Sequence, residues 1–207
     1  MGAVGKSFRR AIELDPNSSN AHGDFATYLL WPLGRMEEAL QHLRIAEKMD
    51  PLSPERHFQL AYVLVPAGRY DEAAIHCEAL PEDFWAKSGC VGRARFWQGK
   101  NQPLQVLETA LDQGVSPGSE VRGYLGYAYA RAGRREVAEK LAATTTPFNQ
   151  AVIFAGLGEK DRAFEALDRA ATAGPFRIGR ILTWPELSLL RGDPRVNALR
   201  RKVGLPE

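Results

Sequence analysis

Apolar residues recur along this chain with the spacing of amphipathic helices. Between residues 53 and 80, a first apolar stripe includes Ala61, Tyr62 and Leu64. A second stripe follows at i, i+3, i+4, i+7 and i+10, counted from residue 70. Pro66 and Gly68 lie between the two stripes and are typical of a helix end. The pattern therefore predicts a helix, a tight turn and a second helix.

The same helical pair recurs at a nearly constant interval. The turn glycine Gly34 returns as Gly68, 34 residues later, and Gly133 follows Gly99 by another 34. The interval shortens to 31 residues between Gly68 and Gly99, and to 25 between Gly133 and Gly158. Intervals of this size indicate stacked units that bury their apolar faces only against one another. We therefore expect an all-α solenoid.

The first unit carries one additional residue. In the second unit the small residue Ala61 lies seven positions before the turn glycine, where close helix packing requires a small side chain. In the first unit the corresponding alanine, Ala26, lies eight positions before Gly34. The pattern places the insertion near residues 30–32.

These features resemble the tetratricopeptide repeat, a helical hairpin of about 34 residues. The second unit is the best copy, with Ala61, Leu64, Gly68, Tyr70 and Ala73 at the positions that the family favours. The resemblance covers about residues 4–175. It implies a right-handed superhelix of a half repeat and about five hairpins, and we expect residues 176–207 to form a C-terminal helical cap.

The first predicted helix, residues 4–14, has the pattern of the second half of a repeat. Val4, Phe8 and Ile12 lie on one apolar stripe, and no first half precedes them. A repeat buries its apolar face only against neighbours. We therefore expect the chain to begin inside a longer array or to be a fragment, and to self-associate through this helix.

The C-terminal region resembles a broad group of bacterial multi-domain tetratricopeptide proteins. The resemblance rests on residues 155–164, 190–195 and 203–206. Members often carry a winged-helix DNA-binding, protein-kinase or nucleotide-cyclase domain. The resemblance implies the interaction or sensing module of a bacterial protein of signalling or transcription regulation.

Composition limits the kind of partner and the compartment. A net charge of +2 does not indicate direct nucleic acid binding, and no apolar stretch is long enough for a membrane span. Cys77 and Cys90 have neither zinc-site nor redox-motif spacing. We expect two reduced thiols in a cytoplasmic protein.

The first helix of each hairpin should line the concave side of the stack. Counting back from each turn glycine gives a predicted partner-binding groove of aromatic and arginine side chains: Phe58, Tyr62, Arg93, Phe96, Trp97, Tyr127 and Arg131. Aromatic residues and arginine dominate interface energetics, and arginine pairs with carboxylates. The groove predicts non-catalytic binding of a protein or peptide. The alternative is a small-molecule or lipid-binding solenoid, in which four of these aromatics line a closed pocket.

The four histidines do not indicate a metal site in the sequence. His22 and His57 share one repeat position, and His42 and His76 share another. Equivalent positions lie about one repeat, roughly 10 Å, apart, so they should not share an ion. His76 and Cys77 are adjacent on one helix and face different directions. We expect no catalytic residue, no metal and no cofactor.

Overall fold

The computed structural model describes residues 2–99, 103–112 and 114–206, and these residues confirm the predicted all-α solenoid. Helix α1 (Gly2–Leu14) precedes the hairpins. In the described part of the chain five hairpins follow: α2 (Ser19–Phe25) continued by η1 (Ala26–Leu30) with α3 (Met36–Met49), α4 (Pro54–Leu64) with α5 (Tyr70–Glu78), α6 (Lys87–Trp97) with α7 (Pro103–Asp112), α8 (Glu120–Arg131) with α9 (Arg135–Ala143), and α10 (Pro147–Gly156) with α11 (Lys160–Ala170).

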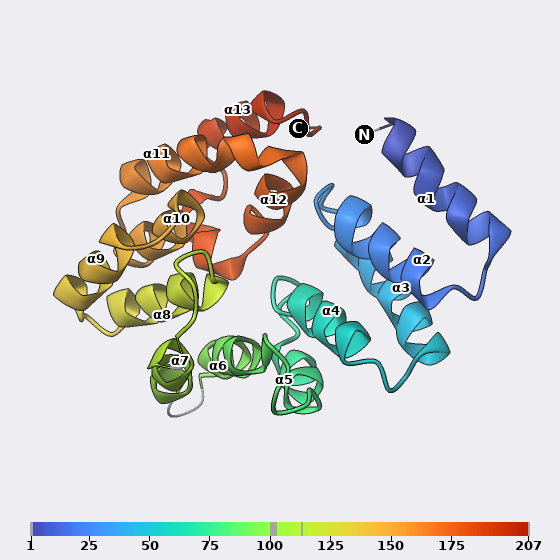
Figure 1. The fold of residues 1–207 in the computed structure, drawn as a ribbon. Coiled ribbons are helices and arrows are strands. Elements are labelled where there is room, and N and C mark those ends of the chain that lie inside the picture. The colour runs from blue at the N-terminus through green and yellow to red at the C-terminus, as the bar shows by residue number, and fades with distance from the viewer. Residues whose placement is uncertain (1, 100–102, 113, 207) are drawn as a thin grey trace.

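The hairpins stack side by side into an arc. The first helices of successive hairpins, α4, α6, α8 and α10, contact one another along the inner row. Beyond α11 the chain continues through η2 (Ala171–Ala173), α12 (Gly174–Ile181), η3 (Pro185–Leu190) and α13 (Pro194–Lys202). Helix α12 lies on the concave side of the arc (Figure 1).

The turn glycines have the backbone conformation that the repeat pattern requires. Gly34, Gly68, Gly99, Gly133 and Gly158 adopt positive φ angles between 67° and 80°. Residues with a Cβ rarely adopt this conformation, so glycine permits the tight turn between the two helices of each hairpin. These glycines confirm the position of the turn in each hairpin.

The additional residue of the first hairpin is accommodated by a π-helical turn, η1. The Trp31 amide donates to the Ala26 carbonyl at 2.9 Å, a bond across five residues instead of four. Single π-turns arise where one residue is inserted into an α-helix. Trp31 is fully buried, and its indole Nε1 donates to the Thr183 hydroxyl at 2.8 Å. The insertion therefore joins the first hairpin to the C-terminal segment.

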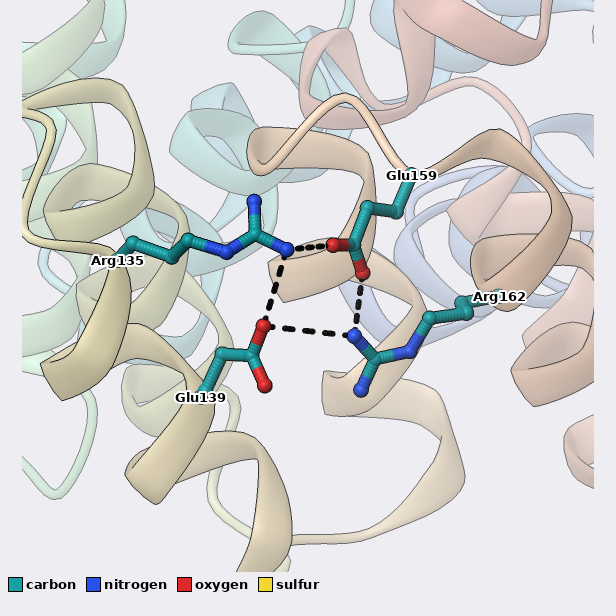
Figure 2. A network of polar contacts seen from close by, with 4 residues as sticks. All are labelled: Arg135, Glu139, Glu159 and Arg162. Atoms are coloured by element: carbon teal, nitrogen blue, oxygen red, sulfur yellow. Dashed lines mark hydrogen bonds and ion pairs between the residues drawn. The ribbon is translucent and has the colours of Figure 1, made fainter.

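A polar network crosses the outer surface between α9 and α11 (Figure 2). Arg135 contacts Glu139 at 3.1 Å and also pairs with Glu159. Arg162 pairs with the same two carboxylates. All four side chains are partly exposed, so this network contributes little to stability.

The expectation of two reduced thiols is wrong. A disulfide joins Cys77 on α5 to Cys90 on α6, with 5.4 Å between their Cα atoms. The reason is tertiary: α5 and α6 pack against each other and bring the two cysteines within the usual Cα separation of a disulfide. The bond links the second hairpin to the third.

The C-terminal residues divide between two places. Helix α13 packs on the last hairpin helix, α11, whereas η3 contacts α10 of the inner row. The proposed division of the chain into 4–175 and 176–207 stays a prediction, and residue 207 lies outside the described residues. Within the described chain, every helix is too short or too polar to cross a membrane.

Candidate functional site

The chain's own C-terminal segment occupies part of the concave face. Glu186, in η3, accepts two hydrogen bonds from the Arg93 guanidinium, at 2.7 and 2.8 Å. Both side chains are almost fully buried. Burial alone would lower the pKa of Arg93, but the Glu186 carboxylate outweighs burial and raises it above its ordinary value. Arg93 therefore pairs with an internal carboxylate.

Trp184 fills the space beside this ion pair. The Arg93 guanidinium lies 4.3 Å from the centre of the Trp184 ring and 4.5 Å from that of Tyr124. Phe148 meets Trp184 edge-on, with ring centres 5.5 Å apart. These contacts are cation–π and aromatic interactions that add to apolar burial. They hold the C-terminal segment against α6, α8 and α10.

Trp97, at the end of α6, also contacts Glu186. The Trp97 indole Nε1 donates to the Glu186 carboxylate at 3.0 Å. Phe96 lies edge-on to Tyr127 at 5.7 Å, and Trp97 lies 5.9 Å from the same ring. Arg131, at the end of α8, is exposed. The structure thus gathers Arg93, Trp97 and their aromatic neighbours around a carboxylate of the same chain.

The rest of the concave face forms a partly open cavity of about 540 Å³. Its walls come from α4, the start of α6, the loop before α8, and α12. Phe58 and Tyr62 stack on one wall with ring centres 5.2 Å apart. The cavity is therefore lined by three of the predicted groove residues, Phe58, Tyr62 and Arg93.

An exposed tryptophan stands at the edge of this cavity. Trp85 is 77% exposed, and its ring lies 5.1 Å from Phe58 in an edge-on arrangement. Phe84 lies 5.8 Å from both rings. Together, Phe58, Phe84 and Trp85 form an aromatic platform with one side in solvent.

Charged groups also line the cavity. Glu120 accepts hydrogen bonds from the hydroxyls of Tyr62 and Tyr124, the latter at 2.9 Å. Arg180 of α12 donates to the Tyr62 hydroxyl at 3.1 Å. Burial, and then the Glu120 carboxylate, raise the pKa of Tyr62 far above its ordinary value, so this phenol stays neutral. Arg177, one turn earlier on α12, is exposed.

Sequence reasoning did not place the C-terminal residues in this site. Arg177, Arg180, Trp184 and Glu186 belong to the region expected to be a cap. The one signal that could have connected them to the groove is the insertion before Gly34, because the buried Trp31 that follows from it contacts this segment. Periodicity describes neighbouring repeats, and it says nothing about a segment that returns across the stack.

Two comparisons relate the chain to known proteins. Residues 28–87 match a family model described as tetratricopeptide repeat. Among solved structures, YrrB, described as a TPR protein with an unusual peptide-binding site, is 21% identical with a TM-score of 0.51; the match covers 86% of this chain and 97% of that one. The pilF protein of Pseudomonas aeruginosa is 16% identical with a TM-score of 0.54, over 84% of each chain. No curated protein matches. The chain therefore has a tetratricopeptide-type fold, with tetratricopeptide repeats identified in residues 28–87.

Proposed function

We propose that the concave cavity binds a short peptide of a partner protein, one that combines an apolar side chain with a carboxylate. The exposed indole of Trp85 carries this proposal. A tryptophan that is 77% exposed and supported by Phe58 presents a large apolar surface to solvent. Tryptophan is enriched among the residues that dominate binding energy at interfaces.

The charges around the cavity support a carboxylate on the ligand. Arg177 and Arg180 line the same cavity as Phe58 and Trp85. The adjacent part of the same concave face already holds a carboxylate, because Glu186 is bound by Arg93 and Trp97. YrrB, which shares the fold, is described as having a peptide-binding site.

The broader role follows from the resemblance of the C-terminal region. We propose a non-catalytic interaction or sensing module of a bacterial regulatory protein that self-associates through α1. Cytoplasmic location stays part of this proposal. The Cys77–Cys90 disulfide is the observation against it, because such bonds persist mainly in oxidising compartments.

Peptide display tests the binding site directly. A library of random peptides selected on the wild-type protein should yield sequences that pair an aromatic or aliphatic residue with Asp or Glu. Trp85→Ala and Phe58→Ala should each weaken the selected peptides by at least about tenfold, since such anchors are worth more than about 1.4 kcal/mol. Leu52→Ala is the matched control, because Leu52 is 90% exposed and is not among the cavity-lining residues. Selected peptides that bind all three variants equally would refute the site.

The alternative is a small apolar ligand, and the cavity volume favours it as the second candidate. About 540 Å³ lies within the range of small-molecule sites. An environment-sensitive fluorescent fatty acid should then bind with a Kd that rises in Phe58→Ala. If the probe binds and no peptide is selected, the small-ligand function replaces the peptide function.

A further inference from the structure

Three potential metal ligands converge between the first and second hairpins, away from the concave cavity. The Nδ1 atoms of His57 and His76 are 3.1 Å apart. A Glu47 carboxylate oxygen lies 3.5 Å from the first of these nitrogens and 3.3 Å from the second. Among the described residues, this is the one group of three such side chains that converge on a point.

The distances among these atoms are those of a tetrahedral ion. A Zn²⁺ ion with bonds of about 2.0–2.1 Å holds neighbouring ligand atoms about 3.3 Å apart. The three separations in the structure, 3.1, 3.3 and 3.5 Å, lie close to this value. Two imidazoles and one carboxylate are also a ligand set found in zinc sites that keep one position open.

The surroundings of His57 prepare its Nδ1 for a metal. Its other ring nitrogen, Nε2, lies 3.1 Å from the Pro51 carbonyl oxygen, which can only accept a hydrogen bond. Nε2 therefore carries the proton, and the lone pair of Nδ1 faces His76 and Glu47. Histidines that ligate metals commonly donate their second N–H to a backbone carbonyl in this way.

We infer that Glu47, His57 and His76 bind a Zn²⁺ ion, with water as the fourth ligand. The side chains are 26%, 21% and 19% exposed, so solvent reaches the site. They come from α3, α4 and α5, and the ion would link the last helix of the first hairpin to both helices of the second. This inference does not depend on the function proposed for the cavity.

The cluster does not consist of repeat-equivalent histidines. His22 and His57 are equivalent, as are His42 and His76, and equivalent residues lie a repeat apart. The structure instead joins non-equivalent residues within a hairpin, because His57 on α4 and His76 on α5 face each other. The first hairpin contains an equivalent histidine pair: the Nδ1 atoms of His22 and His42 are 2.7 Å apart.

The His22–His42 pair is a control built into the chain. His22 Nε2 lies 3.1 Å from the Pro16 carbonyl, as His57 Nε2 does from Pro51. In the described residues, no carboxylate completes this pair as Glu47 completes the other. The two histidine pairs thus differ in whether a carboxylate lies beside them. The ion is therefore expected at His57 and His76 and not at His22 and His42.

Calorimetric titration of Zn²⁺ into the tag-free, chelator-stripped, disulfide-bonded chain tests the site. One ion should bind per chain, and Co²⁺ in its place should show the intense visible absorption of four-coordinate cobalt. Zn²⁺ should also raise the unfolding midpoint, since a ligand that binds only the folded state stabilises it. Absence of binding, or Co²⁺ absorption typical of six oxygen or water ligands, would overturn the proposal.

Variants then assign the ligands. Glu47→Gln, His57→Gln and His76→Gln should each weaken Zn²⁺ binding by at least about tenfold, the least that even outer-shell changes usually cost. His42→Gln should leave the affinity unchanged. Circular dichroism without metal identifies any variant that fails to fold, and the remaining variants then decide. Equal losses in His42→Gln and His76→Gln, or full affinity in Glu47→Gln, would show that the ion binds elsewhere.

Discussion

The Arg93 guanidinium and the Glu186 carboxylate form a buried ion pair with two hydrogen bonds, at 2.7 and 2.8 Å, between residues 93 positions apart. Arg93 lies on an inner helix of the repeat stack, and Glu186 lies on the segment that follows the stack. The pair therefore fixes the C-terminal segment to the concave face. It also means that any ligand of the complete groove would have to replace this segment.

Removal of Glu186 should destabilise the fold strongly. Glu186→Ala leaves the Arg93 charge buried without its partner, and losses of about 3–5 kcal/mol are typical of such changes. Chemical unfolding measures the loss. Glu78→Ala is the control, because Glu78 pairs with Arg95 at 3.1 Å with both side chains exposed, and it should change stability by less than about 1 kcal/mol. Similar effects of the two variants would show that the Arg93–Glu186 pair is accessible to solvent.

Gly179→Ala should loosen α12 from the first hairpin. A Cβ at this position would lie 2.8 Å from the Pro32 Cα, and this neighbour is backbone that cannot rotate away. Overpacking of this kind costs about 1–3 kcal/mol, measured by chemical unfolding. Gly118→Ala is the matched change, because its nearest neighbour would be 3.9 Å away. A Gly179→Ala protein as stable as Gly118→Ala would contradict the close approach.

Reduction of the Cys77–Cys90 disulfide should lower stability by about 3 kcal/mol, the value for a short loop in the chain-entropy account. Unfolding curves of the oxidised chain and of the chain refolded with reductant measure the difference. The Cys77→Ala/Cys90→Ala variant should unfold at the same point with and without reductant. Thiol alkylation in cells, followed by mass spectrometry, shows whether the bond forms there, and a fully reduced pair would agree with cytoplasmic location.

Acid should weaken the first hairpin through His42. Burial, and then the neighbouring His22, lower the pKa of His42 below its ordinary value of 6.5. The unfolded chain therefore binds this proton more tightly than the folded chain does. The stability of the fold is unaffected by the protonation of His42 above about pH 6.5, and the free energy of unfolding decreases as the pH falls below that value. Unfolding free energies between about pH 7.5 and pH 5 should fall more steeply for the wild type than for His42→Gln. If the unfolding free energies of the wild type and of His42→Gln fall in parallel with pH, His42 is not the group responsible.

Self-association through α1 should depend on its exposed apolar side chains. Val4 and Leu14 are 54% and 69% exposed, whereas Phe8 packs against Phe25 at 6.2 Å. Sedimentation should show a mass that increases with concentration, and Val4→Glu/Leu14→Glu should abolish the increase. Leu52→Glu, at a residue 90% exposed outside α1, should not. A monomer at every concentration would remove this part of the proposal.

Much of the fold could be predicted because each repeat is specified locally. The helix–turn–helix unit follows from the apolar stripes and from glycines such as Gly68, which meets the need for a positive φ. The insertion near residues 30–32 was also visible, since it shifts Ala26 by one position relative to Ala61. Its structural form, a π-turn that buries Trp31, was not.

The candidate site was less predictable because its two halves are far apart in the chain. Register alone placed Phe58 and Tyr62 on an inner helix, and both line the cavity. Arg180, which donates to Tyr62, comes from 118 positions later. No spacing rule connects them, since the contact depends on how far the stack curves and on where the chain re-enters it.

The repeat, its turns and its inner and outer helices follow from the amino-acid sequence, because they depend on propensities and apolar spacing within about 35 residues. The partner of Arg93, the disulfide, and the contact of His57 with His76 and Glu47 arise only from packing in three dimensions. Each of these depends on two helices packing at one separation and rotation. A one-dimensional pattern specifies which face of a helix is apolar, but the side chains that meet across it are chosen by packing.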